Sequence, residues 1–133
     1  MMMFVRFLSV LTILMFSVSA FGQMLDPVKW RYKLNDLGDN EYELVFEAKI
    51  DEGWTVYSQF TSDEGPVPTS LNFETEEGYK LLGKAEEIGH KKKGKDKLFD
   101  NIVVIKFLAD QPFIIKQKIR ADSKTNEIKG YLT

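Results

Sequence analysis

The segment that comes nearest to a known chemical motif is GHKKKGK, residues 89–95, which has the G-x-x-x-x-G-K spacing of a phosphate-binding loop. In that motif a Ser or Thr follows the lysine and binds magnesium, and a helix N-terminus faces the phosphate. Here Asp96 follows, an anion that would repel phosphate, and no helical pattern comes next. We therefore expect residues 85–97 to form a solvated, mobile loop whose lysines at most steer an acidic partner.

Few other residues have the types that catalysis or metal binding needs. His90 is the only histidine and lies among lysines that would repel a metal cation, and the chain contains no cysteine. The sequence therefore lacks the several ligands of a metal site and the parts of a hydrolytic triad. The acidic pair Glu86-Glu87 is expected in a loop without any sign of burial, which does not favour a glycosidase pair. We expect no metal and no cofactor.

The aromatic segment GWTVY, residues 53–57, offers a binding surface rather than a reaction centre. In a strand, Trp54 faces one way together with Val56, and Tyr57 faces the other way. One face would enter the core, which would leave the other face available to a partner. The alternative is that all of these aromatic residues only pack in the core or at its edge, because aromatic residues are common in strands.

The elements that must position these residues are predicted to be strands. Apolar and polar residues alternate with the period of two that is typical of half-buried strands, and turn-forming residues separate the segments. One segment, residues 102–108, is almost continuously apolar, which is typical of a central strand covered on both faces. The predicted strands are residues 28–34, 42–50, 54–60, 70–74, 79–84, 102–108, 113–121 and 127–133.

About eight short strands at this spacing predict an all-β fold, an immunoglobulin-like antiparallel β-sandwich. A small barrel is the alternative, because the number of strands does not distinguish the two. The alternation also predicts which side chains contribute to the core or its rims. These are Trp30, Tyr32, Tyr42, Leu44, Phe46, Val104 and Phe107.

The first 22 residues are predicted to be a signal peptide. Arg6 gives a positive start, and residues 7–16 form an apolar run that is too short to span a bilayer comfortably. Small residues around Ala20 and Gly22 offer a cleavage site after either of these two positions. We therefore expect export to the periplasm, where residues 23–133 form one domain.

The net charge and the absence of cysteine bear on nucleic-acid binding and on disulfides. Removal of Arg6 leaves 17 of the 18 basic residues against 20 acidic residues, a net charge near −3, which gives no basis for binding nucleic acid. Without cysteine, no disulfide joins parts of this chain. A domain of about 110 residues can fold without one by burying the inner faces of a sandwich.

Four stretches in order, DPVKW, YELVFEAKIDEGWTVYSQ, GPVPTSLNFE and YKLLGK, resemble the periplasmic N-terminal domain of the DsbD family of thiol:disulfide interchange proteins, in its Bacteroidetes-like version. The resemblance covers residues 26–133 and is most specific at residues 42–59. It implies an immunoglobulin-like sandwich in which a cysteine pair accepts electrons from a membrane thiol module. That pair passes them to thioredoxin-like periplasmic proteins by thiolate attack on a disulfide.

The resemblance also implies which residues of this chain would border the redox site. The aromatic strand after the turn matches Trp54 and Tyr57, and a cap loop that shields the cysteines matches residues 83–99, with Phe99 nearest to the cap aromatic. The family's cysteine pair follows the position matched by Thr133. We therefore expect the natural protein to continue past Thr133 with two cysteines, and residues 1–133 alone to be inactive as a disulfide reductase.

Two other classes of function remain open. The first is a non-catalytic secreted sandwich that binds a carbohydrate, a peptide or a protein partner through Trp54, Tyr57 and neighbouring loops. The second is an assembly domain that docks by strand addition, since residues 127–133 form a predicted strand with no closing turn and leave an open sheet edge.

Overall fold

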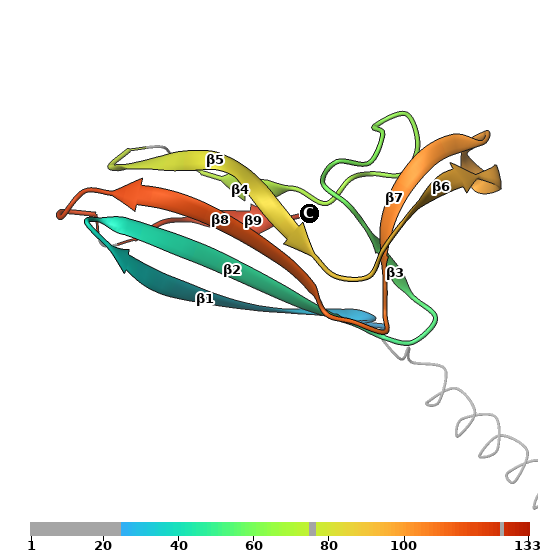
Figure 1. Ribbon diagram of the computed structural model, residues 1–133, viewed down its shortest axis with the longest axis horizontal. Coiled ribbons are helices and arrows are strands. Elements are labelled where there is room, and N and C mark those ends of the chain that lie inside the picture. Colours follow the sequence, from blue (N-terminus) through green and yellow to red (C-terminus); the bar gives the residue numbers. More distant parts are fainter. Residues whose placement is uncertain (1–24, 75–76, 126) are drawn as a thin grey trace, which may run out of the picture.

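The computed structural model describes residues 25–74, 77–125 and 127–133 (Figure 1). Over these ranges the chain forms nine strands in antiparallel sheets and one short 3-10 helix, so the expected antiparallel all-β fold is confirmed. The predicted signal peptide, residues 1–22, lies outside the described residues. None of the helical structure within the described ranges is long and apolar enough to cross a membrane.

The largest sheet contains four strands in the order β1-β2-β8-β5, each antiparallel to its neighbours. Alternation of side chains explains how it forms: in β8, buried residues at every second position face the interior, and the intervening residues face outward. The bounds of the four strands are β1 Val28–Gly38, β2 Glu41–Ile50, β8 Phe113–Ala121 and β5 Tyr79–Ile88.

Two smaller sheets complete the fold. One has the order β3-β7-β6, and the other pairs β4 with β9. In Figure 1 the sheet of β3, β6 and β7 lies at one end of the large sheet, and β4 and β9 lie along the large sheet. The bounds are β3 Thr55–Tyr57, β7 Ile102–Leu108, β6 Lys91–Asp96, β4 Leu71–Phe73 and β9 Gly130–Leu132, and the helix η1 (Lys97–Phe99) joins β6 to β7.

The core lies where the large sheet meets the smaller ones. Phe107 of β7 stacks on Phe113 of β8 with ring centroids 4.2 Å apart, and Trp30 of β1 meets Phe113 edge to face at 6.0 Å. Leu71 of β4 and Leu132 of β9 pack against the same cluster. The buried members of the cluster are Ala48, Ile50, Val56, Phe107, Phe113 and Ile115.

The predicted core residues separate into a buried group and a rim, with one exception. Val104 and Phe107 are buried, Trp30 and Phe46 pack against the core cluster from its rim, and the remaining rim residues, Tyr42 and Leu44, are half-buried. The prediction for Tyr32 was wrong, because its side chain is 84% exposed. Alternation determines which face of β1 a side chain occupies, but it does not determine how far along the strand that face is covered.

The lysine-rich segment is not the loop that its charge predicted. Strand β5 continues to Ile88, and after a short connection β6 pairs along its whole length with β7. Strand β6 is paired with the mainly apolar strand β7 at six successive positions, and hydrogen bonds of the ladder hold it there. Its position at the edge of the sheet leaves the lysine side chains in water. The hairpin therefore forms despite the repulsion between like charges.

Gly89 lies where the chain leaves the large sheet and enters β6. Its φ is +151°, a conformation that L side chains rarely adopt. A Cβ at this position would lie 2.9 Å from Cδ1 of Phe107 and 3.1 Å from the carbonyl oxygen of Pro112. The crossing from one sheet to the other therefore requires a residue without a side chain.

Candidate functional site

Two of the three predicted site residues meet in the structure. Tyr57 is the last residue of β3 and Phe99 is the last residue of η1, and their rings lie edge to face with centroids 6.2 Å apart at 90°. Both side chains are half-buried. A perpendicular pair of this kind adds a preferred orientation to the burial of apolar area. The hairpin of β6 and β7 thus delivers Phe99 to the end of the aromatic strand.

A small second cluster holds this aromatic pair in place. A Cβ on Gly65 would lie 3.6 Å from Cβ of Phe99 and 3.6 Å from Cγ1 of Val104, so the loop after β3 lies against both side chains. Val104 is buried and lies on the opposite face of β7 from Phe107, because the two positions differ by an odd number. Strand β7 is the central strand of its sheet, as its apolar sequence predicted, and it contributes one buried side chain to each face.

Trp54, the third predicted site residue, lies apart from this pair. It sits in the turn before β3, where its backbone N–H donates a hydrogen bond to the carbonyl oxygen of Asp51 at 3.0 Å. The side chain is 45% exposed, and among the described residues it makes no ring contact with Tyr57 or Phe99. Within the same segment, Val56 enters the core.

Glu87 makes partly buried hydrogen bonds that the sequence did not predict. The buried hydroxyl of Ser58 donates to Oε1 of Glu87 at 2.5 Å, and the backbone N–H of Gln59 donates to Oε2 at 2.9 Å. The N–H of Phe60 in turn donates to the hydroxyl oxygen of Ser58 at 3.0 Å. Glu87 is half-buried whereas Glu86 is exposed, so the expectation that neither shows burial was wrong for Glu87. These hydrogen bonds fix the turn after Tyr57 to β5.

Loss of this carboxylate should destabilise the fold measurably. In Glu87→Ala, the buried hydroxyl of Ser58 and the N–H of Gln59 lose their acceptor, and we expect the free energy of unfolding to fall by about 1–3 kcal/mol. The exposed neighbour provides a matched control, and Glu86→Ala should change it by less than about 0.5 kcal/mol. Urea denaturation of the three proteins measures both values. Equal losses of stability in the two variants would show that the hydrogen bonds of Glu87 contribute nothing specific.

The single histidine has a partner. Nδ1 of His90 lies 2.7 Å from both carboxylate oxygens of Asp110, which links the β5–β6 connection to the β7–β8 connection. Both side chains are largely exposed. Two residues do not make a metal site, and the described part of the chain has no group of three or more His, Asp and Glu side chains placed to hold a metal ion.

Asp122 shows the clearest electrostatic perturbation of a described carboxyl group. The hydroxyl of Thr125 donates to it, as do the backbone N–H groups of Lys124 and Thr125, and these hydrogen bonds hold the pKa of Asp122 below its usual value. The side chain closes the exposed turn after β8. We therefore interpret this carboxylate as a turn cap and not as a catalytic acid.

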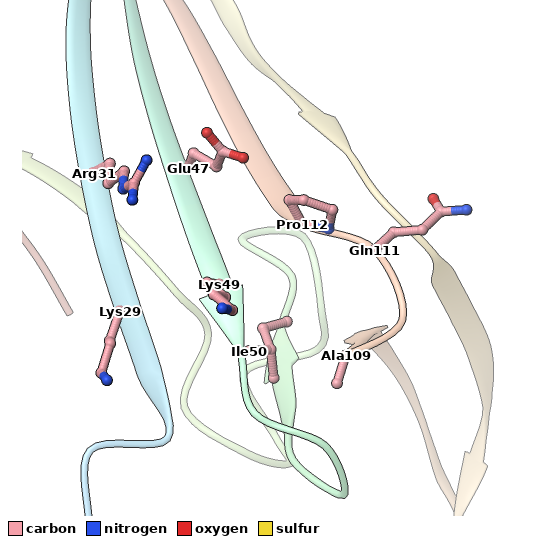
Figure 2. A pocket seen from close by; sticks show the side chains of 8 residues that line it. All are labelled: Lys29, Arg31, Glu47, Lys49, Ile50, Ala109, Gln111 and Pro112. Atoms are coloured by element: carbon pink, nitrogen blue, oxygen red, sulfur yellow. The ribbon is translucent and has the colours of Figure 1, made fainter.

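A shallow hollow of about 460 Å³ lies on the outer face of the large sheet (Figure 2). Three cations and one acid line it: Lys29 and Arg31 come from β1, and Glu47 and Lys49 from β2. The turn before β8 closes one side with Gln111 and Pro112. None of the predicted site residues lines this hollow, and its excess of cations could at most favour a small anion.

Comparison with protein-family models, with curated protein sequences and with solved structures gives no match to this chain. The resemblance of residues 26–133 to the DsbD family therefore stays a prediction.

Proposed function

We propose that this chain is the scaffold of a periplasmic thiol–disulfide electron-transfer domain. The domain would pass reducing equivalents from a membrane thiol module to thioredoxin-like proteins. The observation that carries the proposal is the contact between Tyr57 and Phe99. These residues lie far apart in the sequence, and the resemblance implies that one borders the redox site and that the other is its cap aromatic. The antiparallel all-β fold agrees with this function.

The register of β9 gives a second line of support. The N–H and carbonyl groups of Thr133 and Ser70 exchange hydrogen bonds of 2.9 and 3.1 Å, which extends the pairing of Leu132 with Leu71. Residues laid beyond Thr133 in the same register would run beside Thr69 and toward the loop that touches Phe99. Residues 1–133 contain no cysteine, so the proposal assigns the redox pair to that following stretch.

In the proposed reaction, two electrons pass from the cysteine pair of this domain to the disulfide of its partner. One thiolate of the cysteine pair attacks a disulfide sulfur of the partner, which forms a mixed disulfide and releases one partner thiolate. The second thiolate then attacks the mixed disulfide, so the pair is oxidised to a disulfide and the partner gains two thiols after protonation. The half-buried ring of Phe99, as the cap over the cysteine pair, would limit contact of the thiols with small oxidants until a partner displaces it.

The test uses the natural full-length protein with every residue that its gene encodes after codon 133. We expect two cysteines there, and reduction of the disulfide of a thioredoxin-like partner by the reduced protein. In Phe99→Ala the thiols should react several-fold faster with a small aromatic disulfide, because less of their surface is covered. Leu98→Ala is the matched control, since Leu98 is 86% exposed and next in sequence.

Two results would contradict the proposal. The first is a gene without cysteine codons after codon 133, because then no thiol pair exists. The second is equal thiol reactivity in the wild type, Phe99→Ala and Leu98→Ala, which would show that Phe99 covers nothing reactive.

The half-exposed indole of Trp54 favours a second candidate, a non-catalytic sandwich that binds a carbohydrate, peptide or protein. Exposed aromatic faces stack on sugars and pack on peptides, and this ring is not engaged with Tyr57 or Phe99. Titration with glycans and peptides should then change the tryptophan fluorescence. The response should disappear in Trp54→Phe and persist in Trp30→Phe, and it should not depend on any thiol.

A further inference from the structure

Strand β6 carries the highest density of uncompensated charge in the described part of the chain. Lys91, Lys92, Lys93 and Lys95 are all exposed, and no described carboxylate lies within ion-pair distance of them. The carboxylate of Asp96, the one acid in the strand, accepts a hydrogen bond from the N–H of Leu98 at 2.9 Å and so caps η1. The proposed redox function makes no use of the lysine side chains of this strand.

The backbone of β6 is available along one side. The strand is the last in the order β3-β7-β6, so among the described strands it has a partner on one side only, at the end of the arm seen in Figure 1. The carbonyl of His90 accepts a hydrogen bond from the N–H of Leu108 at 3.0 Å, which fixes the alternation of the ladder. Lys91, Lys93 and Lys95 therefore direct their N–H and C=O groups away from β7.

The side chains of these three lysines share one face of the sheet with apolar neighbours. Lys93 lies across from Ile105 and Lys95 across from Val103, whose side chain is 41% exposed. The free edge thus carries a row of cations beside partly exposed apolar groups. A strand that paired there would find both charge and apolar surface to contact.

Gly94 interrupts the row of lysines for no reason that the fold supplies. Its φ lies outside the left-handed region, and a Cβ added to it would meet nothing within 4 Å. Glycine in a strand weakens it and marks sites where another backbone approaches closely. At an edge strand, the missing side chain leaves room for such an approach.

We propose that the free edge of β6 docks an extended acidic segment of a partner protein by strand addition. The backbone of the segment pairs with the outward N–H and C=O groups of Lys91, Lys93 and Lys95. Asp or Glu at alternate positions of the segment lie across from the lysine side chains, where opposite charges stabilise the pairing and like charges destabilise it. The same lysines repel the β6 edge of a second copy of the chain, so the edge selects acidic strands over copies of itself.

The probe is a short blocked peptide in which Glu and Val alternate, titrated into the mature chain and followed by fluorescence anisotropy. We expect it to bind, and a peptide with Gln in place of Glu to bind about tenfold more weakly or not at all. In the edge variant, Lys91→Ser, Lys93→Ser and Lys95→Ser together, affinity for the Glu peptide should fall by about tenfold.

A control variant distinguishes binding at the β6 edge from a general effect of net charge. Lys29→Ser, Lys33→Ser and Lys49→Ser together remove the same charge from the outer face of the large sheet, and should leave the affinity unchanged. Circular dichroism establishes that both variants are folded. Equal weakening in the two variants would overturn the proposal in favour of nonspecific attraction.

The backbone component is tested on the peptide, so that folding of the protein is not at issue. A Glu–Val peptide N-methylated at alternate residues keeps its charges but loses the donors that strand pairing needs, and we expect it not to bind. Hydrogen exchange at the amides of Lys93 and Lys95 should slow only with the unmethylated peptide. Equal binding of the two peptides, or no binding of either, would overturn the proposal.

Discussion

Replacement of Phe113 by alanine is expected to lower the free energy of unfolding by about 3–5 kcal/mol, a large share of the stability of a domain of this size. Phe113 is 0% exposed and lies at the junction between the large sheet and the sheet of β3, β6 and β7. Its ring stacks on Phe107 and contacts the edge of Trp30. Alanine would remove both contacts and leave a cavity between strands that cannot collapse without moving two sheets.

Phe46→Ala is the matched control, because it deletes the same atoms from a position at the rim. Phe46 packs against the core cluster but is only partly buried, so its loss should cost about 1–2 kcal/mol. Urea denaturation of residues 23–133 gives both values, and the slope of each transition should match that of the wild type. A cost for Phe113→Ala no greater than that for Phe46→Ala would contradict the position of the core described above.

The strands were predictable because their signal is local. The alternation in residues 113–121 buries every second side chain, and the continuous apolar run of residues 102–108 becomes a central strand with one buried side chain on each face. Each of these features follows from the period of two and from the composition of one short segment.

The lysine strand could not be predicted in the same way, because its stability comes from its neighbour. Residues 91–96 have neither apolar alternation nor β-branched residues, and it is pairing with β7 that holds them extended. The burial of Glu87 depends likewise on Ser58, which lies 29 residues away. Tyr32 shows the reverse case, since a correct strand pattern did not reveal that β1 is exposed at this position.

Two of the three residues predicted to border the site meet in the structure. The resemblance selected Tyr57 and Phe99, which meet, but it placed Phe99 at the end of a cap loop over residues 83–99. That segment consists of the end of β5, the whole of β6 and η1. A hairpin therefore supplies the rigid support for Phe99 that a loop of lysines would not.

Gly89→Ala is expected to destabilise the protein by about 2–4 kcal/mol, from backbone strain and overpacking together. At φ +151° a Cβ is strained whatever space surrounds it, and here it would also lie 2.9 Å from the ring of Phe107. Relief requires that Phe107 move, and Phe107 stacks on Phe113 at the centre of the core. The backbone carbonyl of Pro112, 3.1 Å from the added atom, closes the other direction.

Gly94→Ala provides the control for this substitution, since Gly94 lies only five positions further along the same hairpin arm. A methyl group there meets nothing within 4 Å, and the φ is not in the left-handed region, so stability should change by less than about 0.5 kcal/mol. Urea denaturation and the melting temperature distinguish the two variants. If Gly89→Ala is as mild as Gly94→Ala, then the chain can pass from β5 to β6 with a side chain at the crossing. In that case the contact of the two sheets around Phe107 must be looser than the 4.2 Å ring stack implies.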